Sequence, residues 1–139
     1  MRVGMFLAVS LSIILFAAPL YAVDMHEGRW EITVDMTMEG MNISMPPTKT
    51  FTCITKEDMV PKSEMDKNCT FKDQKISGNT VRWHVICKDK EATSEGKGEV
   101  TYSGASYKGG MKMSVTDKRG ETMRMTMKMS GKRVGPCTK

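Results

Sequence analysis

Few side chains in this chain are suited to acid–base or nucleophilic chemistry. There are only two histidines, His26 and His84. His84 stands between Trp83 and Val85 in an alternating segment, so its side chain is expected on the outward face of a strand. A covalent hydrolase needs a nucleophile beside a base, and the chain has no G-x-S-x-G sequence and no pattern of paired carboxylates. We therefore expect no catalytic residues, no cofactor and no enzymatic activity.

Methionine is the unusual residue type, with 15 copies among 139 residues. Thioether side chains are flexible and fill irregular gaps, so one interpretation is that those on strands form the core. Such a core is poorly specified and can repack around an apolar guest. A second interpretation is therefore a site for a small apolar or lipid-like ligand, formed by Met36, Met38, Met41, Ile43, Met45, Met111, Met113, Met125 and Met127.

A soft-metal site is a third interpretation, because thioethers select Cu(I). Met41 and Met45 lie four residues apart, and Met25 and His26 are adjacent. These four residues are the candidate ligands for Cu(I) or Ag(I). The strand methionines are not included, since an ion would not reach them in a dry core.

The first 22 residues are predicted to be a signal peptide. Arg2 supplies a short basic region, residues 5–18 are almost continuously apolar, and Ala22 offers a small residue for cleavage. This segment is too short to be a spanning helix, and no later segment is apolar enough. No cysteine follows the apolar run as a lipid anchor requires. The prediction is a periplasmic or secreted chain with one domain, residues 23–139.

All four cysteines lie in that domain, and an even number in an exported chain favours disulfides over thiol chemistry. Cys69 and Cys87 are equidistant from Gly78, which is at the centre of a predicted turn, so they can face each other on paired strands. Cys53 and Cys137 remain. Their disulfide would tie the C-terminus to an early strand.

The segment 109–131 shows the clearest strand pattern. Methionine or valine alternates with polar residues on both sides of a turn at 117–120, which is typical of a half-buried hairpin. With the turn at this place, Met113 faces Met125, Met111 faces Met127 and Val115 faces Met123. The hairpin has an apolar face of thioethers and a basic, hydroxyl-bearing face.

The same alternation predicts strands over 28–38, 49–54, 69–77, 80–88 and 93–103, with a further strand starting at Tyr107. Phe51 and Cys53 are expected to point inward. The cysteine register requires a bulge between Phe71 and Ile76. Residues 55–60 are predicted to form one helical turn that Pro61 stops. The loop 41–47 contains Met41, Ile43 and Met45 and is expected to be a lid or a contact site.

These elements predict an all-β fold: an antiparallel meander of six to seven strands joined by sequential hairpins. The sheet is expected to be strongly curved or to close into a small up-and-down barrel, with one short helical turn and two disulfides. Gly96 and Gly98 face Met113 and Met111 in the predicted register, and glycines within strands permit sharp curvature.

Charge is distributed unevenly around a formal total of +5. Residues 108–139 contain nine basic and two acidic side chains, whereas residues 23–107 contain 11 basic and 14 acidic ones. One interpretation is that these charges are the solvated face of the strands. The other is that the basic face 108–139 binds an anionic component of the cell envelope. Nucleic acid is disfavoured, because no interleaving of aromatic and basic residues forms a stacking platform.

The chain resembles an exported bacterial family known as domain of unknown function family 3617. The matching elements are Gly28-x-Trp30-Glu31-x-Thr33-Val34, Gly40-Met41 with Met45-Pro46-Pro47, Cys53-x-Thr55, Cys69, Ser77-Gly78-Asn79-Thr80-Val81-x-Trp83-x-x-x-Cys87, Gly98-x-x-Thr101-Tyr102-Ser103-Gly104-x-x-Tyr107-x-Gly109, the methionine strands and Gly131-x-Arg133-x-Gly135-x-Cys137. The resemblance implies an exported, cysteine-bearing domain and implies no activity. Beside a ligand-binding domain, a cell-envelope protein-interaction module stays open.

Overall fold

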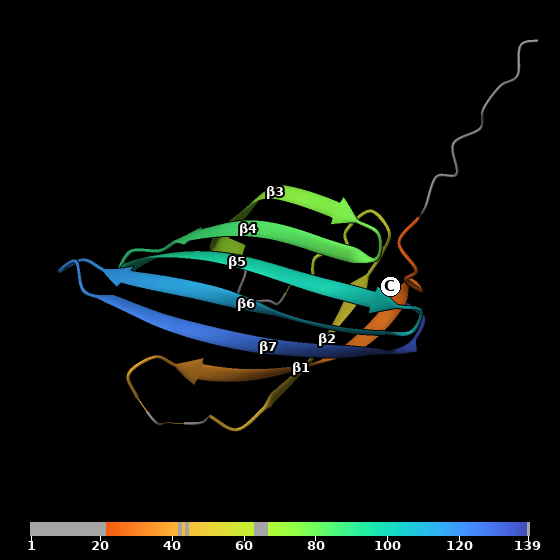
Figure 1. Ribbon diagram of the computed structural model, residues 1–139, viewed down its shortest axis with the longest axis horizontal. Helices are drawn as coiled ribbons and strands as arrows, with labels where there is room; N and C mark the ends of the chain where they lie inside the picture. The colour runs from red at the N-terminus through yellow and green to blue at the C-terminus, as the bar shows by residue number, and fades with distance from the viewer. Residues whose placement is uncertain (1–21, 42, 44, 63–66, 139) are drawn as a thin grey trace, which may run out of the picture.

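The computed structural model describes residues 22–41, 43, 45–62 and 67–138. The predicted signal peptide therefore lies almost wholly outside the described residues. Seven strands are present: β1 (Gly28–Met38), β2 (Thr48–Ile54), β3 (Cys69–Ser77), β4 (Thr80–Lys88), β5 (Ala92–Ser103), β6 (Ser106–Asp117) and β7 (Thr122–Gly135). They form one sheet in the order β2-β1-β7-β6-β5-β4-β3, and every neighbouring pair is antiparallel (Figure 1). The all-β prediction is confirmed.

The pairing of β1 differs from the predicted run of sequential hairpins. Strands β3 to β7 do follow one another, but β1 pairs with β7 on one side and with β2 on the other. β2 and β3 do not pair with each other and form the two edges of the sheet. The sheet is therefore open, and the closed alternative is not adopted. Within the described residues, no helix has the length and apolar character needed to cross a membrane.

The predicted hairpin registers are confirmed. In the β6–β7 pair, Met113 faces Met125 and Met111 faces Met127. In the β5–β6 pair, Tyr102 faces Tyr107. The bulge predicted in β3 lies between Lys72 and Lys75, where Asp73 has a positive φ of 50°. Short-range turn geometry and alternation therefore set these registers.

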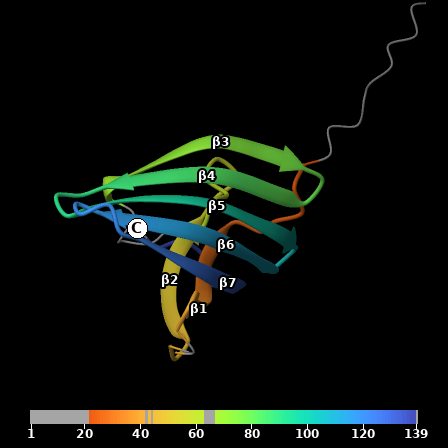
Figure 2. The ribbon, with the colours of Figure 1, turned by 60° about the vertical axis from the view of Figure 1, so that its left-hand side comes forward.

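The apolar face of the sheet is strongly concave. Trp30 on β1 lies three strand spacings from Tyr102 on β5, about 14 Å along a flat sheet. Their ring centroids are nevertheless 5.8 Å apart, and Tyr107 on β6 lies 5.6 Å from Trp30. Figure 2 shows β1 and β2 turned steeply away from the plane of β3 to β6. The three rings form the centre of the core and are almost fully buried.

Two irregular segments close the aromatic end of this concave face. The first contains Met25, whose neighbour His26 donates its backbone N–H to Gly104 O at 3.0 Å, next to the β5–β6 turn. The second is the connection after β2, where Met59 and Val60 are buried. The Tyr102 hydroxyl donates a hydrogen bond to the Met59 carbonyl and anchors this second segment.

The prediction of a helical turn at residues 55–60 is wrong. The Asp58 N–H does bond to Thr55 Oγ1 at 3.2 Å, as a helix cap would. The chain then extends to bury Met59 and Val60 instead of continuing to coil, and a short 3₁₀ turn lies at 67–68. Tertiary burial of two apolar side chains therefore overrides the local capping signal.

The predicted orientation of β2 is also wrong. Phe51 is 50% exposed and lies beside Arg29, whose guanidinium is 4.7 Å from the ring centroid. Cys53 is exposed on the same side. The pairing with β1 turns Thr50, Thr52 and Ile54 to the apolar face. Both predicted disulfides are nevertheless present, Cys53–Cys137 and Cys69–Cys87.

Candidate functional site

A regular array of methionines occupies the end of the concave face away from the aromatic core. Across β1, β7 and β6, one row is Met36–Met127–Met111 and the next is Met38–Met125–Met113. We call these six residues the methionine grid. Residues two positions apart on a strand share a face, and directly opposite residues have Cβ atoms about 4.5–5.5 Å apart. The six thioethers therefore lie side by side on one surface.

Burial falls steadily along this surface from the core outward. Met129, one row nearer the core, is 9% exposed and packs between Val34 and Gly109. The six grid methionines are half-buried. Met123, one row farther out, is 43% exposed. The grid is thus neither a sealed core nor a fully solvated surface.

Glycines on β5 continue the two grid rows and make room for large side chains. The Met36–Met127–Met111 row reaches Gly98, and a Cβ there would lie 2.4 Å from Cζ2 of Trp83. The Trp83 ring is therefore laid across Gly98. The sulfur of Met111 lies over Gly96, 3.3 Å from where a Cβ would be. The grid thus borders a tryptophan on its β5 side.

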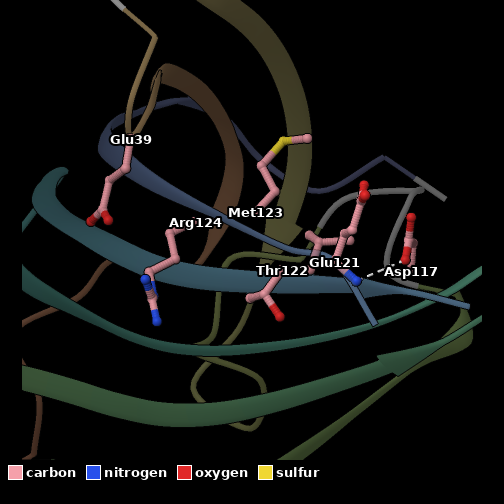
Figure 3. A pocket seen from close by; sticks show the side chains of 7 residues that line it. Glu39, Asp117, Glu121, Thr122, Met123 and Arg124 are labelled. Atoms are coloured by element: carbon pink, nitrogen blue, oxygen red, sulfur yellow. Dashed lines mark hydrogen bonds between the residues drawn. The ribbon is translucent and has the colours of Figure 1, made fainter. Parts of the chain in front are cut away.

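A pocket of about 330 Å³ lies at the outer end of the grid. Its apolar lining comes from Val115 and Met123, which face each other on β6 and β7. Its polar lining comes from Glu39, Asp117, Glu121, Thr122 and Arg124. Figure 3 shows Met123 pointing to the opposite side of β7 from Thr122 and Arg124. The Glu121 N–H donates to Asp117 Oδ1 at 3.0 Å and holds the hairpin end in place. The grid therefore ends in a rim that is part apolar and part charged.

The loop after β1 adjoins this end of the grid but does not cover the core. The Glu39 N–H bonds to Arg124 O at 2.9 Å, so the start of the loop lies against β7. Met41 and Ile43 are 44% and 58% exposed, and Met45 is half-buried. These three predicted ligand residues thus lie in the connection between β1 and β2, where Met41 and Ile43 are exposed.

The four predicted metal ligands are not brought together. Met25 and His26 lie beside Gly104 at the start of β1, and Met25 is buried in the core. Met41 and Met45 follow the other end of β1, which has 11 residues and a length of about 36 Å. No group of three or more His, Cys, Asp or Glu side chains in the described part of the chain is arranged to hold a metal ion.

The opposite, polar face contains a groove of about 650 Å³ that crosses β3 to β7. Lys97 on β5 lies directly opposite Lys112 on β6, and Lys128 on β7 lies diagonally next to Lys112. None of these three forms an ion pair within the residues that the structure describes. Like charges placed directly opposite each other weaken a sheet. The three lysines therefore form a cationic strip across β5, β6 and β7, which we call the lysine strip.

His84 lies at the other side of this groove, outward as predicted. Its Nε2 is 2.7 Å from Glu95 Oε1, and its Nδ1 is 3.7 Å from Asp73 Oδ2. Arg82 forms an ion pair with Glu99 at 2.9 Å. The carboxylates of Glu95 and Glu99 thus contact His84 and Arg82, while Asp35 on β1 lies opposite Lys128.

Shifted pKa values occur away from these surfaces. Burial raises the pKa of Tyr102 and of Tyr107 well above the usual tyrosine range, and in each case a neighbouring group (Asp58 and Tyr102, respectively) raises it further. Backbone N–H groups of Glu91 and Ala92 lower the pKa of Asp89 in the β4–β5 turn. These shifts report packing and turn formation.

Sequence reasoning missed three parts of these surfaces. Val115 and Met123 were paired correctly but not assigned to the site. Lys97 was not joined to the basic face because it precedes residue 108. The β1–β7 pairing, which brings Met36 to Met127, was not foreseen. A signal for it was present, since a Cys53–Cys137 bridge requires the end of β7 to lie near β2.

Comparison with known proteins identifies the family of this chain. No curated protein and no solved structure matches the chain. Residues 25–137 match the family described as "Protein of unknown function (DUF3617)". This range contains all seven strands and all four cysteines. The chain therefore belongs to the DUF3617 family.

Proposed function

We propose that this protein is a non-enzymatic, exported domain that binds a small apolar or lipid-like ligand on the methionine grid. The observation that supports it is the gradient of burial along the concave face. A continuous apolar surface leaves the sealed core at Met129, crosses the half-buried grid and ends at the exposed Met123. Flexible thioethers can repack around guests of different shape.

The size of the surface favours a small ligand over a protein. The grid and the row of Met123 and Val115 cover about 10 Å across the strands and about 14 Å along them. A stable protein interface buries about 800 Å² on each partner, several times this area. Each methylene group that leaves water contributes about 0.8 kcal/mol, so a single acyl chain has enough surface to bind.

Fluorescence of cis-parinaric acid, a fatty acid probe, tests this proposal. A charge in the middle of the grid should exclude the acyl chain, so Met127→Lys should abolish the fluorescence increase. Ser130→Lys is the matched control, because Ser130 lies three residues farther along β7 with its side chain exposed on the polar face. Equal binding by both variants, with circular dichroism showing intact folds, would refute the grid as the site.

Export is part of the same proposal. Two disulfides in one small domain favour an oxidising compartment, and the apolar N-terminal segment has the pattern of a signal peptide. Fractionation of cells that express the full chain should recover protein in the periplasm or the medium. Its intact mass should lack residues 1–22 and four cysteine protons. Full-length, reduced protein in the cytoplasm would contradict it.

The lysine strip supports a second candidate role, binding of an anionic envelope component by the basic face. Lys97, Lys112 and Lys128 line a groove, and a groove suits an extended polyanion better than a flat membrane surface. Binding should weaken with salt, since exposed charges are screened over about 10 Å at 0.1 M ionic strength. Titration with long-chain polyphosphate should show saturable binding that Lys97→Glu and Lys112→Glu remove. Binding only to vesicles of phosphatidylglycerol would favour a membrane instead.

A further inference from the structure

We propose that the methionine grid is a soft-metal site that binds Cu(I) or Ag(I) through thioether sulfurs. The inference goes beyond the apolar-ligand proposal and does not depend on it. It rests on the chemistry of sulfur and on strand register, whereas apolar binding rests on the extent and partial burial of the apolar surface.

The register supplies the ligands in sets of three. Met36, Met127 and Met111 stand directly opposite one another on β1, β7 and β6, and Met38, Met125 and Met113 repeat the arrangement two residues along. Neighbouring Cβ atoms in each set are about 5 Å apart. A methionine side chain has three rotatable bonds, so adjacent sulfurs can turn toward one ion. Each row therefore offers three thioethers to a single metal.

The chemistry of these donors selects the metal. Thioethers are soft, neutral ligands that favour Cu(I), while imidazole suits Zn, Cu, Fe and Ni and carboxylates suit Mg, Ca and Mn. Among the described strand residues, the two grid rows contain only methionine on β1, β6 and β7; alternation places Asp35 on the other face, and Asp117 lies four residues beyond Met113. A monovalent soft ion is therefore the class of metal that fits.

Half-burial leaves the grid sulfurs accessible to an ion, while the sheet holds their side chains close together. A buried methionine such as Met59 cannot be reached without unfolding, and an exposed one such as Met41 lies in a connection rather than on the sheet. The grid side chains retain part of their surface and are fixed by a sheet. A bound ion would be close to Trp83, whose ring lies across Gly98 in line with Met111. Tryptophan fluorescence should therefore report binding.

Titration of the disulfide-bonded chain with Ag(I) alone, and then with Cu(I) under anaerobic conditions, tests this inference. Native mass spectrometry should show one or two ions per chain, one for each row, and tryptophan fluorescence should be quenched as they bind. Met125→Leu with Met127→Leu removes the central sulfur of both rows at nearly constant volume. Affinity should fall at least about a hundredfold, since loss of even an outer-shell partner costs about 10- to 100-fold.

Two controls locate the site. Met129→Leu with Met59→Leu removes two buried sulfurs and should leave affinity unchanged. Met41→Leu with Met45→Leu should also leave it unchanged. Loss of binding in either control pair, or Ag(I) uptake by the Met125→Leu, Met127→Leu variant equal to that of the wild type, would overturn the inference. Leucine preserves apolar surface, so cis-parinaric acid binding should survive in the grid variant. The two proposals can thus fail separately.

Oxidation of the wild-type protein gives a readout that needs no variant. Hydrogen peroxide converts accessible methionines to sulfoxides. Ag(I) should protect Met111, Met125 and Met127 from oxidation, and it should leave the oxidation of Met41 unchanged. Peptide mapping that finds no protection at the grid, with Ag(I) bound, would place the ion elsewhere and refute the site.

Discussion

Two core tyrosines that face each other across β5 and β6 should respond differently to the same substitution, because only Tyr102→Phe should destabilise the fold. The hydroxyl of Tyr102 donates a hydrogen bond to the buried Met59 carbonyl. The hydroxyl of Tyr107 is buried and has no partner within the described residues. A buried polar group that loses or lacks its hydrogen bond costs about 1–3 kcal/mol. Tyr102→Phe creates one such group on the carbonyl, whereas Tyr107→Phe removes one.

The expected values follow from this difference. Tyr102→Phe should lower the free energy of unfolding by about 1–3 kcal/mol, because the 59–60 segment keeps its apolar contacts but loses its anchor. Tyr107→Phe should leave that free energy unchanged or raise it by up to about 2 kcal/mol. The shape of the ring is kept in both, so packing contributes little to either value. The two variants therefore serve as controls for each other.

Urea unfolding with both disulfides intact measures these values, with tryptophan fluorescence as the signal. The dependence of free energy on urea should be the same for all three proteins, which shows that the exposed surface on unfolding is unchanged. A Tyr107→Phe variant that loses more than about 1 kcal/mol would refute the argument, since its hydroxyl would then make a stabilising interaction. So would equal losses in both variants.

The same tyrosines predict the alkaline limit of stability. Burial raises the pKa of both above the value of about 10 in the unfolded chain. Above pH 10 the unfolded state therefore loses protons that the folded state keeps. Stability is complete below that pH and falls as pH rises, by about 1.4 kcal/mol per pH unit for each tyrosine. Urea midpoints between pH 9 and pH 11 should fall less steeply in Tyr107→Phe. Parallel curves would contradict the assignment.

Three further predictions concern the disulfides, the glycines and the lysine strip. Replacing Cys53 and Cys137 by alanine should lower the free energy of unfolding by about 4.6 kcal/mol, and replacing Cys69 and Cys87 should lower it by about 3.2 kcal/mol. The difference arises because the bridges close loops of 84 and 18 residues. A larger loss for the shorter loop in chemical unfolding would contradict this. Gly98→Ala should lower the free energy of unfolding by about 1–3 kcal/mol and shift the Trp83 emission, since the new Cβ would lie 2.4 Å from the ring. An unchanged melting temperature and emission spectrum would contradict this and show that the ring moves freely. Lys112→Glu should stabilise the fold by about 0.2–1 kcal/mol in low salt by facing Lys97 with an opposite charge, an effect that should vanish in 1 M salt.

Much of the local structure could be predicted because it depends on neighbours in the sequence. Alternation assigned Met36, Trp83 and Met127 to one face, and turn positions set the registers from β3 to β7. Symmetry about Gly78 identified the Cys69–Cys87 bridge. These features require only the two-residue period of a strand and the length of a turn.

The errors arose where two distant segments compete for the same position. Phe51 has the side chain of a core residue, but the pairing with β1 turns it outward and admits Thr50 and Thr52 instead. The capping signal at Thr55 forms its hydrogen bond, yet burial of Met59 and Val60 stops the helix. In each case the gain from tertiary packing exceeds a local preference of a fraction of a kcal/mol.

The amino-acid sequence by itself determined an all-β chain with a thioether face, a basic face and two disulfides. Tertiary structure alone decided that Met36 stands beside Met127, 91 positions away, and that the sheet curves until Trp30 meets Tyr102. It also decided that the grid is half-buried while Met129 is sealed. The reason is that strand periodicity is set between adjacent residues, whereas the pairing of remote strands and the burial of a face depend on closing long loops and packing the whole sheet.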